Sequence, residues 1–231
     1  MNLFYTDNVA EDALILRGEE HIHCTKALRH NVGDYISITD GKGSVFHSCI
    51  EKINKVETLC KVLNVTKTEP LRPAISIAIA PTKNAARIEW LTEKAVEIGI
   101  SEIVLFRSVR SERKTFNAER IKKIAISAMK QSQQACLPEL ISLDSFEKML
   151  QYTKKYSAKF IAYCDGPGTL LTDRLQSGKD TVVLIGPEGD FTPGEVKSAT
   201  DAGYYPVSLG QNRLRTETAG LVALVMMRFQ P

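Results

Sequence analysis

The chain has 231 residues, 43% of them hydrophobic, and a formal net charge of +3. Its length is enough for one large domain or for a small domain and a medium one. No run of residues approaches the roughly 18 to 20 consecutive apolar side chains of a membrane-spanning helix, and the first residues are acidic where a signal peptide is basic. We therefore expect no membrane partner and a cytoplasmic location.

The cysteines and histidines exclude several kinds of site. The five cysteines are scattered and include no Cys-x-x-Cys pair, which argues against a disulfide framework or a zinc ribbon. All four histidines lie in the first fifty residues, so a Ser-His-Asp triad cannot form within the C-terminal part. His21, His23 and Cys24 follow one another too closely for tetrahedral coordination, and we expect no metal.

The first part of the chain, to about residue 68, is predicted to be rich in β-strands. Residues 19–29 are typical of a short helix, and residues 34–53 alternate around the turn Asp40-Gly41-Lys42-Gly43, which indicates a hairpin. Pro70 and Pro73 then interrupt the pattern. We predict one domain at residues 1–70 and a second at 71–231.

The second part alternates apolar strands with amphipathic helices. Residues 75–80 form a continuous apolar run, typical of a parallel strand covered on both faces, and apolar residues then recur at helical spacing between Ile88 and Ile98. Further strands are expected at 103–106, 160–164, 181–185 and 204–209, with a helix at 118–134. This pattern predicts an α/β domain with a mostly parallel sheet. Its ligand site should lie in the loops after Cys164, Ile185 and Leu209.

The loop after Ile185 precedes a helix with a clear start signal. In GPEGDFTPGEV, Thr192 and Glu195 form a capping-box pattern with Pro193 at the first helical position. The loop itself, residues 186–191, is either an ordinary turn or one whose glycines let the backbone approach a ligand.

The loop after Leu209 is richer in charge. In LGQNRLRTETAG, Arg213 and Arg215 precede a helix that begins near Glu217. These arginines are either surface residues that pair with Glu217, or they hold an anionic or polar substrate group. The third loop, DGPG at 165–168, is by itself an ordinary turn.

Residues 107–130 carry eight basic side chains against two acidic ones. Such a run is either a solvated face or a phosphate-binding surface. The chain has neither a glycine-rich dinucleotide fingerprint after the strand at 75–80 nor a Walker A motif, which argues against dinucleotide binding and nucleotide hydrolysis. The residues alone therefore predict an α/β ligand-binding protein with an unassigned ligand.

GPEGDF followed by LGQNRLRTETA resembles the ribosomal RNA small-subunit methyltransferase E family of the SPOUT class. The segments KNAARIEWLTEKAVEIGISEI, RSERK, AMKQSQQACLP and HIHCTKALRHNVGD resemble other motifs of that family, so the resemblance covers most of the chain. Lys130 and Gln134 stand where the family usually has glutamate and arginine, and Asn212 with Arg213 where Arg-Ile is common. Arg215 is therefore a residue-by-residue match, whereas Arg213 is not.

The resemblance implies a parallel sheet with a C-terminal trefoil knot, preceded by a small β-rich, PUA-like barrel that binds RNA. It also implies a homodimer and S-adenosyl-L-methionine as cofactor. The implied reaction is methylation of N3 of a uridine in 16S rRNA of the small ribosomal subunit, giving 3-methyluridine. Two alternatives are a SPOUT methyltransferase acting on another RNA and a non-catalytic RNA-binding assembly factor for the ribosome.

The same resemblance assigns site residues. The implied cofactor-binding residues lie at two strand ends and in the loops that follow: Leu184, Ile185, Gly186, Pro187, Glu188, Gly189, Leu209, Gly210, Asn212 and Leu214. For catalysis, our hypothesis is that Arg215 stabilises the charge left on uracil and that Glu217 orients Arg215, with Glu188 as a weaker candidate base. Basic residues expected to contact RNA are Lys26, Arg29, Arg110, Arg113 and Lys114.

Overall fold

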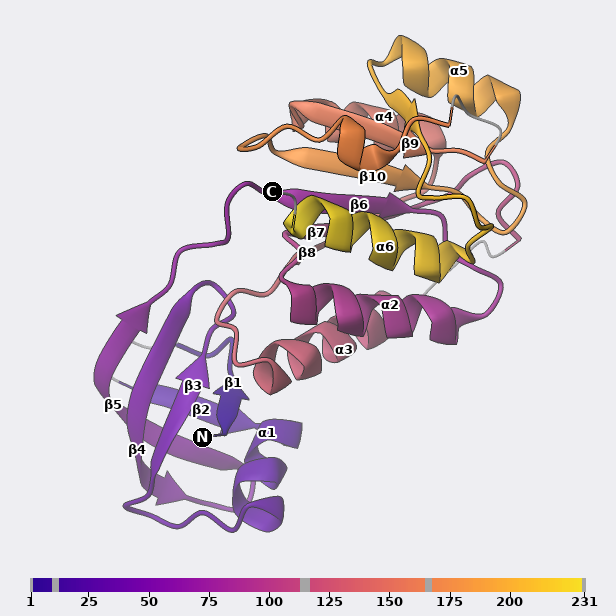
Figure 1. The fold of residues 1–231 in the computed structure, drawn as a ribbon. Helices are drawn as coiled ribbons and strands as arrows, with labels where there is room; N and C mark the ends of the chain where they lie inside the picture. The colour runs from indigo at the N-terminus through magenta and orange to yellow at the C-terminus, as the bar shows by residue number, and fades with distance from the viewer. Residues whose placement is uncertain (1, 10–12, 113–116, 165–167, 230–231) are drawn as a thin grey trace. The chain divides into compact units, whose positions relative to one another are not determined.

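The computed structural model describes residues 2–9, 13–112, 117–164 and 168–229, and the chain divides into two compact units (Figure 1). Unit 1 comprises Met1–Pro70 and Ile126–Leu137, and unit 2 comprises Leu71–Ala125 and Pro138–Pro231. Arg113, Lys114 and residues 165–167 of the DGPG loop lie outside the described residues. No helix in the described ranges has the length and apolar character needed to cross a membrane.

Unit 1 is a five-stranded sheet with a short helical segment. Its strand order is β1 (Leu3–Tyr5), β3 (Tyr35–Thr39), β4 (Ser44–Ile53), β5 (Glu57–Lys67) and β2 (Ala13–Arg17). β1 pairs in parallel with β3, and the other neighbours are antiparallel. The predicted short helix is α1 (Gly18–Ile22), which continues as a π-helical turn, His23–Ala27.

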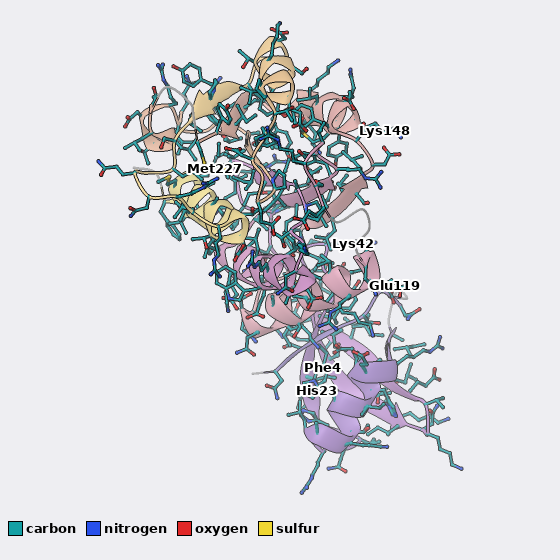
Figure 2. All side chains as sticks on the ribbon, turned by 90° about the vertical axis from the view of Figure 1, so that its right-hand side faces the viewer. Phe4, His23, Lys42, Glu119, Lys148 and Met227 are labelled. Carbon is teal, nitrogen blue, oxygen red and sulfur yellow. The ribbon has the colours of Figure 1, made fainter. Side chains whose placement is uncertain are left out.

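The core of unit 1 is formed by apolar side chains from the sheet and from the helical segment. Phe4, Ile38 and Cys24 belong to it, and the ring of Phe4 lies 5.8 Å from the ring of His23 (Figure 2). His21 is buried, and its Nδ1 lies 2.8 Å from the Thr58 hydroxyl. These contacts give His21 and His23 packing roles within this unit.

The predicted hairpin joins β3 to β4. Asp40 Oδ1 accepts hydrogen bonds from the backbone N–H groups of Lys42 and Ser44, at 2.7 and 3.2 Å. Gly43 has a φ of 97°, and a Cβ at this position would lie 2.4 Å from the Thr68 carbonyl oxygen. Glycine is therefore required here by both the backbone conformation and the lack of space.

The segment Ile126–Leu137 packs within unit 1, although the sequence analysis assigns it to the second domain. The Gly43 N–H donates to the Ala135 carbonyl at 3.0 Å, and Lys130 forms an ion pair with Glu20. Lys130, one of the departures from the family pattern, therefore has an anionic partner in this chain.

Unit 2 contains a six-stranded sheet in which every pair of neighbours is parallel. The strand order is β11 (Tyr205–Val207), β9 (Ala158–Ala162), β10 (Thr181–Ile185), β6 (Ile75–Ile79), β7 (Glu102–Phe106) and β8 (Glu139–Leu143). All residues of β6, β7 and β10 are buried, because helices cover both faces of the sheet. The α/β class and the parallel sheet are confirmed.

Helices form a layer on each face of this sheet (Figure 1). α2 (Ala85–Ile98) and α6 (Thr216–Arg228) contribute Leu91 and Leu224 to the core on one face. α4 (Phe146–Tyr152) and α5 (Pro193–Asp201) contribute Met149 and Ala199 to the core on the other. Although α6 follows the edge strand β11, it packs against β6 and β10 in the middle of the sheet.

Several predicted boundaries differ from the structure, among them that of the strand expected at 204–209, which is β11. β9 ends at Ala162, so Tyr163 and Cys164 belong to the following loop. α3 (Ala118–Gln131) ends before the predicted residue 134. Gln133 has a φ of 57°, and the N–H of Gln134 donates to the Met129 carbonyl at 3.0 Å, so the chain turns out of the helix here.

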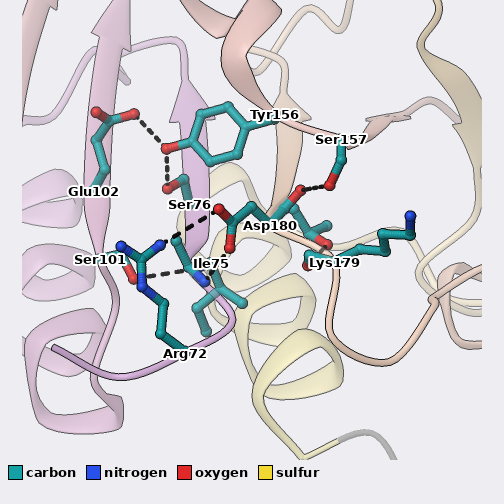
Figure 3. A network of polar contacts seen from close by, with 11 residues as sticks. Arg72, Ile75, Ser76, Ser101, Glu102, Tyr156, Ser157, Lys179 and Asp180 are labelled. Carbon is teal, nitrogen blue, oxygen red and sulfur yellow. Dashed lines mark hydrogen bonds and ion pairs between the residues drawn. The ribbon is translucent and has the colours of Figure 1, made fainter. Parts of the chain in front are cut away.

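The amino ends of the strands carry a buried polar network (Figure 3). Glu102, only 3% exposed, accepts hydrogen bonds from the hydroxyls of Tyr156 and Tyr152 at 2.7 and 2.5 Å and pairs with Lys155 at 2.7 Å. Burial is the main cause that raises the pKa of Tyr156. Because each of these polar groups has a partner, this edge of the sheet has a structural role.

The predicted capping box at the start of α5 is confirmed. The Thr192 hydroxyl accepts a hydrogen bond from the Glu195 N–H at 3.2 Å, and Glu195 Oε2 accepts one from the Thr192 N–H at 2.9 Å. Glu195 Oε1 also accepts a hydrogen bond from the Val109 N–H at 2.9 Å. The box therefore joins α5 to the loop after β7.

We predict that Thr192→Ala lowers the free energy of unfolding by about 1 kcal/mol, because it removes a side-chain cap from α5. Urea denaturation monitored by circular dichroism measures the change. Ser198→Ala, on the exposed side of the same helix, should change stability by less than about 0.5 kcal/mol. Equal stability of the two variants would contradict a stabilising capping box.

Candidate functional site

A cavity of about 700 Å³ lies at the carboxyl ends of β9, β10 and β11 in unit 2. Its walls come from residues 162–164, 185–190 and 207–216, which follow these three strands, together with Arg87, Arg110 and Ala219. Parallel strands end at the same edge of a sheet, so loops far apart in the sequence converge there. We refer to this space as the first cavity.

Nine of the ten residues predicted to bind the cofactor line the first cavity. They are Ile185, Gly186, Pro187, Glu188, Gly189, Leu209, Gly210, Asn212 and Leu214. Leu184 does not: it is fully buried in the core beneath α4 and α5. Successive side chains of a strand point to opposite faces, so the Leu184 side chain lies on the other face of the sheet from that of Ile185.

The loop after β10 has a tight turn that brings its backbone to the cavity wall. The Asp190 N–H donates to the Pro187 carbonyl at 2.9 Å, and Asp190 has a φ of 58°. The Asp190 side chain accepts hydrogen bonds from the N–H groups of Phe191 and Cys164, at 2.7 and 3.3 Å. Asp190 therefore ties the loop after β10 to the loop after β9.

Arg110, predicted to contact RNA, lies against this loop. Its Nη1 donates to the Gly189 carbonyl at 2.7 Å and lies 3.4 Å from the Phe191 carbonyl. These charge-assisted contacts of the guanidinium with backbone carbonyls stabilise the conformation of the loop after β10. The structure therefore gives Arg110 a place in the wall of the first cavity, which the sequence prediction did not include.

Glu188, the weaker candidate base, is engaged by groups from the start of α2. Its Oε1 accepts a hydrogen bond from the Lys83 N–H at 3.2 Å and lies 3.5 Å from Arg87 Nη1. This oxygen therefore has two positively polarised neighbours. The geometry favours a binding or loop-positioning role for Glu188 over proton abstraction.

Glu217 lies in the first turn of α6 and is only 7% exposed. Its Oε1 lies 3.6 Å from Arg87 Nε, and its Oε2 is buried without a hydrogen-bond partner. Within the described part of the chain, Glu217 makes no ion pair with Arg215. The hypothesis that Glu217 orients Arg215 stays a prediction, and the structure adds Arg87 as a neighbour of the Glu217 carboxylate.

Arg215 ends the loop and is the residue from which α6 begins. Its backbone is extended, with φ −69° and ψ 155°, and its side chain is exposed. Arg213 and Arg215 both line the first cavity. The sequence prediction that these arginines border a ligand site agrees with their positions.

A second cavity, of about 610 Å³, adjoins the first. Its lining residues come from the starts of α2 and α6 and from the loop before α6: Ala86, Arg87, Trp90, Arg213, Leu214, Arg215, Glu217 and Thr218. Four of them, Arg87 and Arg213 to Arg215, also line the first cavity. The two spaces therefore share a wall.

Arg87 and Trp90 are site residues that the sequence analysis missed. They lie near the N-terminus of the helix that follows β6, and the Asn84 side chain caps this helix by accepting from the Ala86 N–H at 3.0 Å. The available signal was the position of this helix directly after a strand expected to be buried on both faces. The helical periodicity predicts only which residues of this helix are buried, and Arg87 and Trp90 are not among them.

Lys26 and Arg29, predicted to contact RNA, are exposed in unit 1. Lys26 is in the π-helical turn, and Arg29 follows it with a φ of 58°. Among the described residues, no group of three or more His, Cys, Asp or Glu side chains could hold a metal ion.

Comparison with known proteins identifies the family. The model of the RNA methyltransferase domain matches residues 68–228. The ribosomal RNA small subunit methyltransferase E of Bacillus subtilis is 26% identical over 228 residues, which cover 93% of this chain and 89% of that protein.

Solved structures agree over nearly the full length. A probable rRNA methyltransferase from Porphyromonas gingivalis is 43% identical, with a TM-score of 0.91 over 97% of this chain and 95% of that one. The ribosomal RNA small subunit methyltransferase E of Neisseria gonorrhoeae, solved bound to S-adenosyl methionine, is 26% identical, with a TM-score of 0.85 over 98% and 96% of the two chains. The resemblance found in the GPEGDF and LGQNRLRTETA motifs is confirmed, and the chain belongs to the RNA methyltransferase family of ribosomal RNA small subunit methyltransferase E.

Proposed function

We propose that this protein transfers a methyl group from S-adenosyl-L-methionine to N3 of a uridine in 16S rRNA of the small ribosomal subunit. The observation that carries the proposal is the first cavity, which three loops form at the carboxyl edge of a parallel sheet in a chain of this family. The Neisseria gonorrhoeae relative, solved with S-adenosyl methionine, supports the choice of cofactor. The cytoplasm is the compartment that fits this substrate.

The residues around the first cavity fit S-adenosyl-L-methionine chemically. A volume of about 700 Å³ lies within the range of small-molecule sites. Ile185, Leu209 and Leu214 offer apolar surface to an adenine ring, and the glycine-bearing loops offer backbone hydrogen-bond groups. Glu188 and Asp190 supply negative charge to a site for a cationic sulfonium. The bound cofactor would supply a methyl group already activated for transfer.

Arg215 is our candidate for stabilising the reacting base. Loss of the imide proton leaves negative charge on O2 and O4 of uracil, which a planar guanidinium can bind with two donors. Arg215 lines both cavities, and in the described residues its side chain has no ion-pair or hydrogen-bond partner. Its guanidinium is therefore available to a substrate that reaches the shared wall.

Residues 1–70, the larger part of unit 1, are proposed as the PUA-like domain that delivers RNA, and residues 71–231 as the methyltransferase domain. A small sheet with a packed core and the exposed side chains of Lys26 and Arg29 supports this assignment. Arg113 and Lys114 keep their predicted RNA role as part of the proposal. Arg110 is instead proposed to hold the loop that forms the cofactor site.

A trefoil knot and a homodimer complete the proposed architecture. The return of the chain from edge strand β11 to the middle of the sheet through α6 is the feature that supports a knot. Val225 and Phe229, 40% and 70% exposed near the end of α6, are apolar surface that a second copy could cover.

The first prediction from this function is a product. Small ribosomal subunits from cells that lack the protein should accept labelled methyl from S-adenosyl-L-methionine when the purified protein is added. Nucleoside analysis of the 16S rRNA should then find 3-methyluridine. Labelled tRNA without labelled 16S rRNA would indicate another RNA substrate, and cofactor binding without any transfer would favour an assembly factor.

The second prediction concerns Arg215. Arg215→Ala should lower kcat by about 100-fold or more, by analogy with the loss of one donor to a developing anion, while calorimetry finds cofactor affinity within a few-fold of wild type. Arg174→Ala is the control, because Arg174 hydrogen-bonds the Tyr205 hydroxyl at 2.7 Å and does not line either cavity. Undiminished turnover would remove Arg215 from the mechanism.

The third prediction uses cysteine reactivity to locate the cofactor. Cys164 is exposed and lines the first cavity, so S-adenosyl-L-methionine should slow its alkylation. Burial raises the pKa of Cys24 to about 11 and that of Cys60 to about 12, so both thiols should stay protonated and unlabelled at about pH 8. Peptide mass spectrometry measures all three. Equal labelling of Cys164 with and without cofactor would exclude binding beside this residue.

A further inference from the structure

The second cavity has the charge of an anion-binding site. Arg87, Arg213 and Arg215 line it together with a single carboxylate, that of Glu217. The helices α2 and α6 both begin at this cavity, which is lined by Ala86 near one start and by Thr218 near the other. Helix N-termini present unpaired N–H groups and a partial positive charge. The surroundings therefore favour a phosphate group.

Trp90 gives the same cavity a flat aromatic wall. It is the single tryptophan of the chain and is 42% exposed. An exposed indole beside arginines is well suited to stack on a nucleobase, as aromatic side chains do in proteins that bind single-stranded nucleic acid. A phosphate site next to a stacking surface matches the two ends of a nucleotide.

Glu217 is the unusual member of this set. Its Oε2 is buried and unpartnered, while Arg87 faces its Oε1 at 3.6 Å. A buried acceptor without a donor is costly and rare in native structures. An ionised carboxylate can only accept hydrogen bonds, so the missing partner must be an N–H or O–H donor.

The sugar of RNA supplies such a donor. A ribonucleotide that stacks on Trp90 and binds its phosphate to Arg213 would bring its ribose between these two groups. The 2′-hydroxyl can donate a hydrogen bond, and DNA lacks it. The imide N–H of the target uracil fits less well, because N3 must point at the methyl donor in the first cavity, whereas Glu217 lines only the second.

We propose that the second cavity is a ribonucleotide subsite beside the reaction centre. In it, Trp90 stacks on a base, Arg213 binds phosphate, and the Glu217 carboxylate accepts a hydrogen bond from the 2′-hydroxyl. Arg87 acts as a positioning residue, because it holds Glu217 and also lies 3.5 Å from Glu188 in the wall of the first cavity. The proposal rests on RNA as the substrate of the proposed function, and it adds a nucleotide that is bound but not methylated.

Intrinsic tryptophan fluorescence reports directly on binding in the second cavity, because Trp90 is the only tryptophan of the sequence. The probes are a short oligouridylate and its 2′-deoxy counterpart, which differ in the 2′-hydroxyl alone. The ribo-oligomer should quench Trp90 and bind about tenfold or more tightly than the deoxy-oligomer, as expected for a hydrogen bond to a charged group. Equal quenching by both, or no quenching by either at millimolar concentration, would overturn the proposal.

Variants test whether Glu217 itself causes the preference for ribose over deoxyribose. Glu217→Ala should bring the ribo-to-deoxy ratio close to one. Glu217→Gln keeps the shape and should give an intermediate ratio, which serves if the alanine variant does not fold. Glu93→Ala is the control, since this carboxylate lies on the same helix as Trp90, pairs with Lys94 and lines neither cavity. If both Glu217 variants fold, as verified by circular dichroism, and keep the wild-type ratio of ribo- to deoxy-oligomer affinity, the role of Glu217 is overturned.

The stacking role of Trp90 has its own test. Trp90→Ala should weaken binding of a fluorescently labelled oligouridylate about tenfold in anisotropy measurements, and Trp90→Phe should weaken it less. Unchanged binding by Trp90→Ala would overturn the stacking role. These experiments use neither cofactor nor methyl transfer. A negative result in the binding experiments would therefore leave the 3-methyluridine prediction standing. A negative result in the methyl-transfer assay would leave the measured preference for ribose unchanged.

Discussion

The packing of α6 against the middle of the parallel sheet is the constraint on which the site depends. α6 follows the edge strand β11 but contacts β6, β10 and α2. The contact is close at Gly220, where a Cβ would lie 2.9 Å from Leu91 Cδ2 and 3.5 Å from Ile79 Cδ1, so a larger residue would displace the Leu91 side chain. Because α6 is held here, residues 207–216 must cross the carboxyl ends of the neighbouring strands. The first cavity is the space between that crossing segment and the loop after β10.

Charged side chains then connect the loops that the strands bring together. Arg110 holds the loop after β10 by its carbonyls, and Arg87 lies between Glu188 of that loop and Glu217 of α6. These bridges join parts of the chain more than seventy residues apart. A mutation at Arg87 would therefore disturb both cavities at once, which is what a positioning residue between cofactor and substrate sites should do.

Acidic side chains at the two edges of the sheet differ in their partners. At the amino edge, Glu102 has partners from Tyr152, Lys155 and Tyr156, as a structural network should. At the carboxyl edge, the Arg215 side chain has no partner among the described residues and Glu217 Oε2 is buried without one. An available guanidinium and a buried unpartnered carboxylate oxygen, both beside cavities, are the physical reason for locating substrate recognition at the carboxyl edge.

The sequence by itself determined the parallel α/β sheet, the capping box of α5 and the two loop motifs that identify the RNA methyltransferase family, because strand burial, helix capping and glycine turns depend on neighbouring residues. Only the tertiary structure decided which side chains meet. The Leu184 side chain packs in the core beneath α4 and α5, because side chains alternate along a strand. The Glu217 carboxylate lies beside Arg87, whereas the sequence analysis paired it with Arg215. The tertiary structure also brought Trp90, more than a hundred residues away in sequence, into the second cavity with Arg215. Periodicity reports which face of α2 is buried, whereas the partner of its exposed end depends on where α6 packs, and local sequence carries no information about that.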